Sequence, residues 1–143
     1  MKTLILTTIT ILYFFTCYGQ WSNIYDNQPV AYLDGYQHNQ QVVADNNGGC
    51  YVIWQDARDR VNVDQIYAQH FDSLGNPQWQ IDGIPLAPTG RLQNKLQAIS
   101  DGQGGAFVIW RDLRDSIGPF NTNVDIWGQR IDASGLLWGP QGK

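Results

Sequence analysis

Residues 45–59 of this chain read DNNGGCYVIWQDARD, and residues 101–115 read DGQGGAFVIWRDLRD. The two stretches share the leading Asp, the Gly-Gly pair and the pattern Val-Ile-Trp-x-Asp-x-Arg-Asp, at a constant offset of 56 residues. Repeats of this length are typical of solenoids, propellers and open arrays, in which each unit packs against its neighbours. The sequence therefore predicts a tandem-repeat fold.

Each copy of the repeat divides into short extended runs separated by turn residues. The runs are rich in aromatic and β-branched side chains, and the Gly-rich turns supply the positive φ angles of tight hairpins. We expect strands at 39–44, 50–55 and 65–71, their counterparts at 96–100, 106–111 and 125–131, and a fourth run carrying Trp79 or Trp138. Four antiparallel runs per unit predict an all-β fold of tandem, blade-like sheets of about 56 residues, an incomplete β-propeller.

The repeat also sets the expected organisation of the chain: a partial repeat at 20–44, a full repeat at 45–100 and a truncated repeat at 101–143. The partial repeat is indicated by Pro29-Val30-Ala31, which matches Pro85-Leu86-Ala87 at the same offset. A propeller typically has about four to eight blades, and these units are too few to close one. We expect further repeats in a longer chain; open stacking of the units and assembly of several chains are the alternatives.

Residues 1–19 have the pattern of a secretory signal peptide. Lys2 precedes an apolar run at 4–15, and the small residues Cys17 and Gly19 lead to a cleavage site before Gln20. The apolar run is too short to span a bilayer. A lipoprotein signal at Cys17 and a buried first strand or helix are the alternatives. We expect no membrane span, and export to the cell surface or the medium.

The composition narrows the range of partners. The formal net charge is −4, and all 13 acidic residues are Asp, which favours turns over helices. Nucleic acid is not an expected partner, because no basic stripe is present. Cys50 stands where the second copy has Ala106, so we interpret it as a small apolar residue rather than half of a disulfide.

The candidate site consists of repeated residues, namely Trp54, Asp56 and Arg58 in one copy and Trp110, Asp112 and Arg114 in the other. Residues at i, i+2 and i+4 of a strand lie on one side of it, and an Asp and an Arg there can form a charge-assisted pair. One interpretation is a catalytic or ligand-binding carboxylate set; the other is a structural ion pair beside a packed Trp. Packing residues recur in every repeat, so we favour the structural interpretation and expect no catalytic residue.

Other chemistry has less support in the sequence. Calcium could be held by loop carboxylates, although their spacing is not that of a calcium loop; the candidates are Asp56, Asp59 and Asp64, and Asp112, Asp115 and Asp125. His38 and His70, the two histidines, have no Cys partner at zinc spacing. Trp79 and Trp138 lie beside turns and are candidates for stacking on a ligand such as a glycan. We expect no cofactor apart from this weak calcium candidate.

The repeat resembles those of large secreted bacterial proteins. The shared motifs are Asp-x-x-Gly-Gly-x-x-Val-x-Trp-x-Asp-x-Arg and the run Asp125-Ile-Trp-Gly-Gln-Arg-Ile-Asp132. The resemblance covers about residues 29–142 and implies a β-propeller-like fold and export, often by type IX secretion, but no known reaction. The C-terminal sorting domain of such proteins is not seen in 101–143. Similarity to sialidase propellers is weaker, because His70 and Arg130 stand where their Asp-box has Ser or Thr.

These observations predict a secreted or cell-surface repeat module that acts as a non-catalytic scaffold or binding surface, as a fragment of a longer protein. Its expected partners are further repeats or domains of that chain, or a protein or glycan ligand. The alternative is a fragment of a secreted carbohydrate-active enzyme, glycosidase or sialidase-like, whose catalytic residues lie elsewhere. A third interpretation is a gene remnant without function.

Overall fold

The computed structural model describes residues 29–59, 63–116 and 123–143, and this part of the chain is all-β without a helix. Sheet 1 consists of β1 (Gln37–Ala44), β2 (Cys50–Asp56), β3 (Gln65–Phe71) and β4 (Ile84–Pro85). Sheet 2 consists of β5 (Gln93–Ser100), β6 (Ala106–Asp112), β7 (Asp125–Asp132) and β8 (Gly135–Leu136). Both sheets are antiparallel with neighbouring strands in chain order. The all-β prediction is confirmed, while the interpretation of the two sheets as blades of an incomplete β-propeller stays a prediction.

The first strand of each sheet carries the same irregularity. β1 starts at Gln37 and β5 at Gln93, a few residues before the predicted runs. The register with the second strand shifts within each of them, next to Asn39 (φ 53°) and Lys95 (φ 57°). Such a β-bulge interrupts the alternation of side chains between the two faces of a strand. The sequence prediction placed the strand starts too late for this reason.

The predicted fourth run was wrong in position. Trp79 and Trp138 lie in bends outside the strands. Sheet 1 takes its fourth strand from Ile84–Pro85, which pairs with the middle of β3, and sheet 2 takes it from Gly135–Leu136 at the end of β7. The backbone N–H of each Trp donates instead to a glutamine side chain of the third strand. Each Trp is therefore held by a side chain rather than by a strand ladder.

The Gly-rich hairpins between the first and second strands are built identically in the two sheets. Oδ1 of Asp45 and Oδ1 of Asp101 each accept two backbone N–H bonds of 2.8 Å within the turn. Gly49 and Gly105 close these turns against the third strand, and a Cβ on either would overlap a carbonyl oxygen of that strand. The repeated Asp and Gly residues thus set the hairpin geometry.

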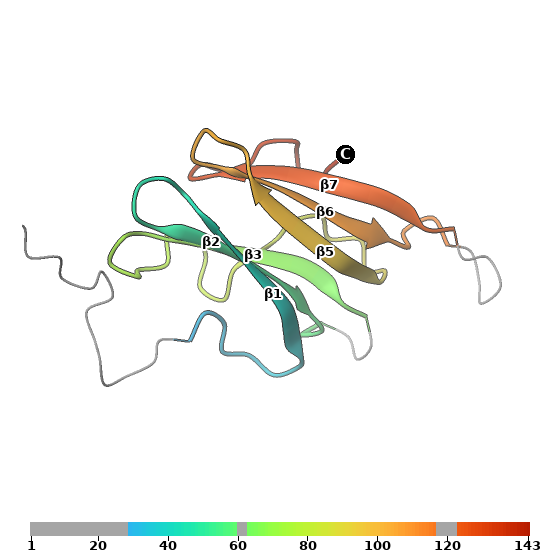
Figure 1. The fold of residues 1–143 in the computed structure, drawn as a ribbon. Helices are drawn as coiled ribbons and strands as arrows, with labels where there is room; N and C mark the ends of the chain where they lie inside the picture. Colours follow the sequence, from blue (N-terminus) through green and yellow to red (C-terminus); the bar gives the residue numbers. More distant parts are fainter. Residues whose placement is uncertain (1–28, 60–62, 117–122) are drawn as a thin grey trace, which may run out of the picture.

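Each sheet has two faces, called here the front and the back, and each face is defined by the residues whose side chains lie on it. The front face carries Tyr51, Ile53, Ile66 and Ala68 in sheet 1, and Phe107, Ile109, Ile126 and Gly128 in sheet 2. The back face carries Val52, Trp54, Tyr67 and Phe71 in sheet 1, and Ala106, Val108, Trp110 and Ile131 in sheet 2. The front of sheet 1 and the back of sheet 2 share one buried core. Figure 1 shows the two sheets stacked on each other. The two sheets therefore stack head to tail, with the front of sheet 1 against the back of sheet 2.

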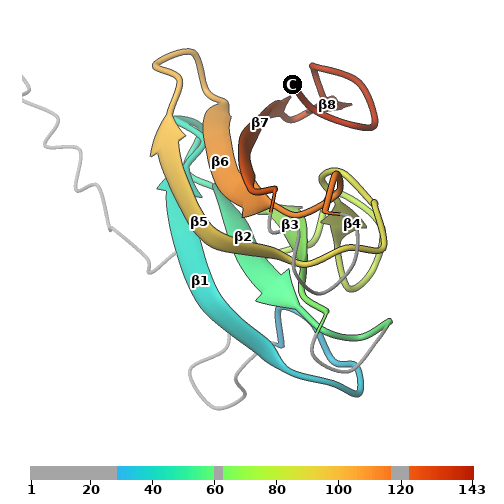
Figure 2. The same cartoon turned by 90° about the vertical axis from the view of Figure 1, so that its right-hand side faces the viewer.

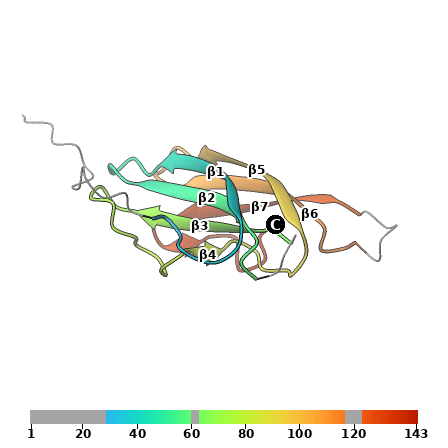
Figure 3. The same cartoon turned by 90° about the horizontal axis from the view of Figure 1, so that it is seen from below.

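The stacking brings the first strands together. β5 contacts β1, β2 and β3 and runs beside β1, as Figures 2 and 3 show. Leu86 and Ala87, after β4, are buried in the core between the sheets. Val30 and Ala31, before β1, pack in the same way on the back of sheet 1. The segment before β1 thus has the place on sheet 1 that Leu86 and Ala87 have on sheet 2, as the match of the two Pro-x-Ala segments predicts.

The two sheets differ in the loop between the second and third strands. Second strands are related by an offset of 56 residues and third strands by 60, because this loop is four residues longer in sheet 2. Register within the sheets is unaffected, since Trp54 pairs with Tyr67 and Trp110 with Trp127.

Candidate functional site

The repeated Trp, Asp and Arg residues meet at the end of the second strand, in an arrangement we call the node. In sheet 1, Oδ2 of Asp56 accepts a hydrogen bond from the indole Nε1 of Trp54 at 2.7 Å and from Nη2 of Arg58 at 2.6 Å. Oδ1 of Asp56 accepts the backbone N–H of Arg58 at 2.8 Å. The Asp side chain is fully buried, so the ion pair lies inside the protein.

The node of sheet 2 has the same geometry. Oδ2 of Asp112 accepts from Nε1 of Trp110 at 2.9 Å and from Nη2 of Arg114 at 2.6 Å, while Oδ1 accepts the N–H of Arg114 at 2.8 Å. A fourth bond of 2.9 Å comes from Nε2 of Gln93 on β5. The structure therefore brings together all three predicted residues in each copy.

Each node arginine is also stacked on the third strand. The guanidinium carbon of Arg58 lies 3.9 Å from the ring centre of Tyr67, and that of Arg114 lies 3.3 Å from the ring centre of Trp127. Such cation–π contacts strengthen when solvent is excluded. Both arginines also donate to a backbone carbonyl of the segment that follows the third strand in the chain, that of Asp82 or of Gln141. The node thus ties the second strand of a sheet to its outer edge.

The node carboxylates are held ionised. Burial opposes the ionisation of Asp56, but hydrogen bonds from Arg58 and Trp54 outweigh burial and hold the pKa of its carboxyl below the ordinary 3.8. Burial likewise opposes the ionisation of Asp112, and bonds from Arg114, Trp110 and Gln93 lower its pKa in the same way. A general acid needs the opposite shift, towards the working pH. The geometry fits a structural ion pair.

The other acidic residues of the loops are engaged separately. Oδ2 of Asp59 accepts the hydroxyl of Tyr67 at 3.0 Å, and burial together with this bond raises the pKa of Tyr67 to about 12. Oδ2 of Asp64 accepts Nε2 of Gln55 at 2.9 Å and lies 3.3 Å from Nε2 of His38. Within residues 29–59, 63–116 and 123–143, no group of three or more acidic, His or Cys side chains is arranged around a metal position.

His70 belongs to a second repeated pair, at the hairpin end of each sheet. Its Nε2 lies 2.9 Å from Oδ2 of Asp45, and Arg130, at the equivalent position, binds Oδ2 of Asp101 at 2.6 Å. Burial opposes the ionisation of Asp45, but bonds from His70 and from the turn amides lower its pKa. The ring of His70 is stacked on Tyr51 at 4.6 Å. The sequence prediction missed this pairing, although both positions alternate with apolar residues on the third strand.

The predicted stacking residues, Trp79 and Trp138, are half-buried. Trp79 lies against Tyr51 and His70, with ring centres 5.8 and 5.9 Å away, and its Nε1 donates to the carbonyl of Ala133. Trp138 lies 5.7 Å from the ring of Phe107. Part of each indole is therefore used in packing. Cys50 is half-buried, and burial raises the pKa of its thiol.

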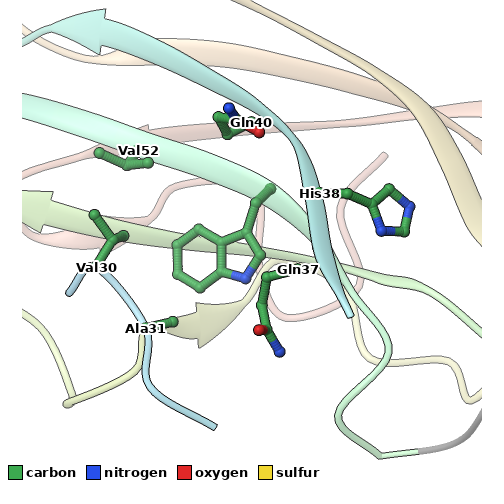
Figure 4. A pocket seen from close by; sticks show the side chains of 7 residues that line it. Val30, Ala31, Gln37, His38, Gln40 and Val52 are labelled. Carbon is green, nitrogen blue, oxygen red and sulfur yellow. The ribbon is translucent and has the colours of Figure 1, made fainter. Parts of the chain in front are cut away.

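A hollow of about 320 Å³ lies over the back face of sheet 1, lined by Val30, Ala31, Gln37, His38, Gln40, Val52 and Trp54. Figure 4 shows Val30 and Ala31 on the segment before β1, and Gln37 and Gln40 on β1 itself. The wall is apolar with amide groups at its rim, and the indole of Trp54 beneath it is 3% exposed. Such a lining suits the docking of an apolar side chain and backbone polar groups.

Three fully buried glutamines, Gln69, Gln93 and Gln129, were missed by the sequence prediction. Gln93 is fully buried, bonds Asp112 and the carbonyl of Ala87, and accepts the N–H of Ile66 from sheet 1 at 2.9 Å. Gln69 and Gln129, on the third strands, accept the N–H groups of the bend tryptophans. Their recurrence in both copies was the available signal, and the glutamine at position 37 is the counterpart of Gln93.

Comparisons with protein-family models, with curated proteins and with solved structures found no match to this chain. None of the secondary-structure elements in the described ranges is a helix of the length and hydropathy needed to cross a membrane.

Proposed function

We propose that this chain is a secreted or cell-surface repeat module, β-propeller-like in its units, that acts as a non-catalytic scaffold or binding surface. Its units would belong to a larger array in which each four-stranded sheet packs on the next. Residues 1–19 would direct export, and they lie outside the described residues.

The observation that carries this proposal is the duplicated node. Asp56 and Asp112 use both carboxylate oxygens inside their own sheet, on the Trp and Arg of the same strand end. A catalytic carboxylate must leave an oxygen for the substrate, whereas a structural one does not. Identical use of the residue in both sheets supports a role in holding each unit together.

The stacking of the sheets supports the array. Leu86 and Ala87 follow the outermost strand of sheet 1 and also pack into the core that sheet 1 shares with sheet 2, so each unit continues into the next without a free linker. Repeat proteins of this kind derive stability from contacts between neighbouring units. They commonly present an extended surface to partners, and a protein or glycan would bind there.

The non-catalytic role is tested by assaying the purified chain against a panel of chromogenic glycosides and a sialoside. The double variant Asp56→Asn/Asp112→Asn serves for comparison, with Asp115→Asn as the matched control in an exposed part of the same loop. We expect no turnover in any of the three proteins. Turnover in the unchanged chain that is lost in the double variant, while circular dichroism shows that variant folded, would overturn the proposal.

A further inference from the structure

Three isoleucines lie exposed on the front face of sheet 2, where the equivalent residues of sheet 1 are buried. Ile99, Ile109 and Ile126 are 69%, 48% and 67% exposed, and their counterparts Val43, Ile53 and Ile66 are 8%, 0% and 0% exposed. The counterparts are buried because sheet 2 covers the front of sheet 1. The front of sheet 2 thus has the apolar character of a surface that is covered in the other sheet.

The opposite difference is found on the back faces. Leu96 is buried on the back of sheet 2, under sheet 1, whereas its counterpart Gln40 on β1 is exposed. Val42, on the back of sheet 1, is 65% exposed, and its counterpart Ala98 packs against the core between the sheets. The hollow beside Trp54 is at the position on sheet 1 equivalent to that of Gln93 and Trp110 on sheet 2, which pack against the front of sheet 1. The front of sheet 2 is therefore uncovered. The back of sheet 1 is uncovered along β1, at Gln40 and Val42, while its Val52, Trp54, Tyr67 and Phe71 side chains are already buried.

We propose that copies of this chain associate head to tail, the front face of sheet 2 of one copy docking on the back face of sheet 1 of the next. The contact inside the chain between sheets 1 and 2 is the template for this association. The surface therefore fits a second copy of the chain, because the two available faces are the sequence counterparts of two faces that already pack together.

The template predicts specific contacts. Inside the chain, Oε1 of Gln93 accepts the N–H of Ile66 at 2.9 Å, and the N–H of Gln93 donates to the carbonyl of Asp64 at 2.8 Å. The counterparts are Gln37 in one copy and Ile126 and Val124 in the other. Ile126 would enter the hollow beside Trp54, with its N–H bound to the side chain of Gln37. The hydrogen bond of Tyr51 to Gly104 has no counterpart, since Phe107 lacks a hydroxyl.

The contact uses two different surfaces, so it is heterologous and leaves one face of each type free after every addition. Such contacts close into rings or continue as open assemblies, according to the rotation between the units. The inference deepens the proposed scaffold role by naming its partner. Head-to-tail association does not depend on the absence of catalysis, which has a separate assay. Either proposal can therefore fail while the other holds.

The first test is the mass of the purified chain by light scattering and sedimentation, from about 1 µM to about 300 µM, the range in which weak interfaces dissociate. We expect the mass to rise with concentration to twice the single chain or more. Ile109→Asp/Ile126→Asp alters the front face of sheet 2 and should weaken association more than about tenfold. Leu74→Asp changes an equally exposed apolar residue in the β3 turn, outside both faces, and should leave association unchanged.

The second test determines whether the chains associate head to tail or through a symmetric contact. Gln40→Asp/Val42→Asp alters the back face of sheet 1 at exposed positions, so this variant keeps a functional front face. It should be a monomer by itself, as should Ile109→Asp/Ile126→Asp. Mixed together, they should form a one-to-one pair through the two unaltered faces, and this pair should grow no further.

Several results would overturn the proposal. The unchanged chain could remain a monomer across the whole concentration range, which would leave the front of sheet 2 to a different unit or partner. Association could persist in Ile109→Asp/Ile126→Asp, or fall equally in Leu74→Asp. Absence of pairing in the mixture, with self-association of the unchanged chain, would indicate a symmetric contact instead of head-to-tail stacking.

Discussion

The hydroxyl of Tyr51, on the front face of sheet 1, donates a hydrogen bond of 2.9 Å to the backbone carbonyl of Gly104, in the hairpin between β5 and β6. Tyr51 is fully buried, and burial, with the nearby carboxylate of Asp45, raises the pKa of its hydroxyl to about 12. The hydroxyl therefore stays protonated and donating at neutral pH. This bond fixes the tip of one sheet to the face of the other.

Tyr51→Phe should lower the free energy of unfolding by about 1 kcal/mol, the usual net contribution of one hydrogen bond. Urea denaturation measures the change, with Tyr32→Phe as a control because Tyr32 is 84% exposed. The same small effect in both variants would show that the bond between the sheets adds nothing to stability.

Asp112→Asn should destabilise the chain by about 3 kcal/mol, because it removes one partner of a buried ion pair and leaves Arg114 unpaired. Thermal unfolding monitored by circular dichroism measures this effect. Asp115→Asn makes the same chemical change three residues further along, at an exposed position, and should be close to neutral. Equal losses of stability in the two variants would contradict a structural role of the node.

The stabilisation from Asp56 and Asp112 should depend on pH. Their pKa values are lowered in the folded chain, so the unfolded chain binds protons more readily. The contribution is complete above the unfolded pKa of about 3.9 and is lost as the pH falls through the lower folded values. The stability difference between the unchanged chain and Asp112→Asn should therefore be constant near neutrality and shrink below about pH 4. A difference that persists unchanged in strong acid would contradict the ionised node.

Gly105→Ala should cost more stability than Gly102→Ala in the same hairpin. At Gly105 a Cβ would overlap the carbonyl oxygen of Ile131 and lie 2.7 Å from Oδ2 of Asp101, which we expect to cost about 2–3 kcal/mol. Gly102 has φ 75° with open space around it, so its substitution adds only backbone strain, about 1 kcal/mol. Chemical denaturation of both variants gives the order, and the reverse order would refute the close packing of Gly105.

Residues 1–19 should direct export and be removed before Gln20. Expression in a bacterium with an intact secretory pathway, followed by mass spectrometry of the exported protein, should find Gln20 as the first residue. An additional Lys beside Lys2 should leave export unchanged, whereas a charged residue within the apolar run at 4–15 should block export. Retention of the unchanged chain in the cytoplasm with Met1 in place would contradict the signal-peptide prediction.

The parts of the fold that the sequence predicted are those that both copies repeat in regular strands. β2 and β6 were predicted nearly to the residue, because their Val-Ile-Trp runs are buried and end at the node Asp. The starts of β1 and β5 were missed, since the bulge at Asn39 and Lys95 has no alternation to detect. The short fourth strands were misplaced, because pairing over two residues depends on tertiary packing and not on local pattern.

The sequence predicted the three residues of each node but not the contacts that these residues make with the rest of the sheet. Trp54, Asp56 and Arg58 share one side of a strand end, which spacing alone indicates. The stacking of Arg58 on Tyr67 and the bond from Gln93 to Asp112 join residues that are not part of one strand, and strand pairing brings them together. The exposure of Ile126 was likewise not predictable, since its sequence environment matches that of the buried Ile66.

The unequal loops between the second and third strands identify a site for engineering. Sheet 2 keeps the strand pairing of sheet 1 although its loop is four residues longer, so the spacing between these strands can vary while the sheet stays the same. Connections whose length varies between equivalent units are where insertions are best tolerated. A peptide epitope or a reactive tag added to the connection between β6 and β7 should therefore leave the strand pairing unchanged, and every additional unit of an array would multiply the number of copies.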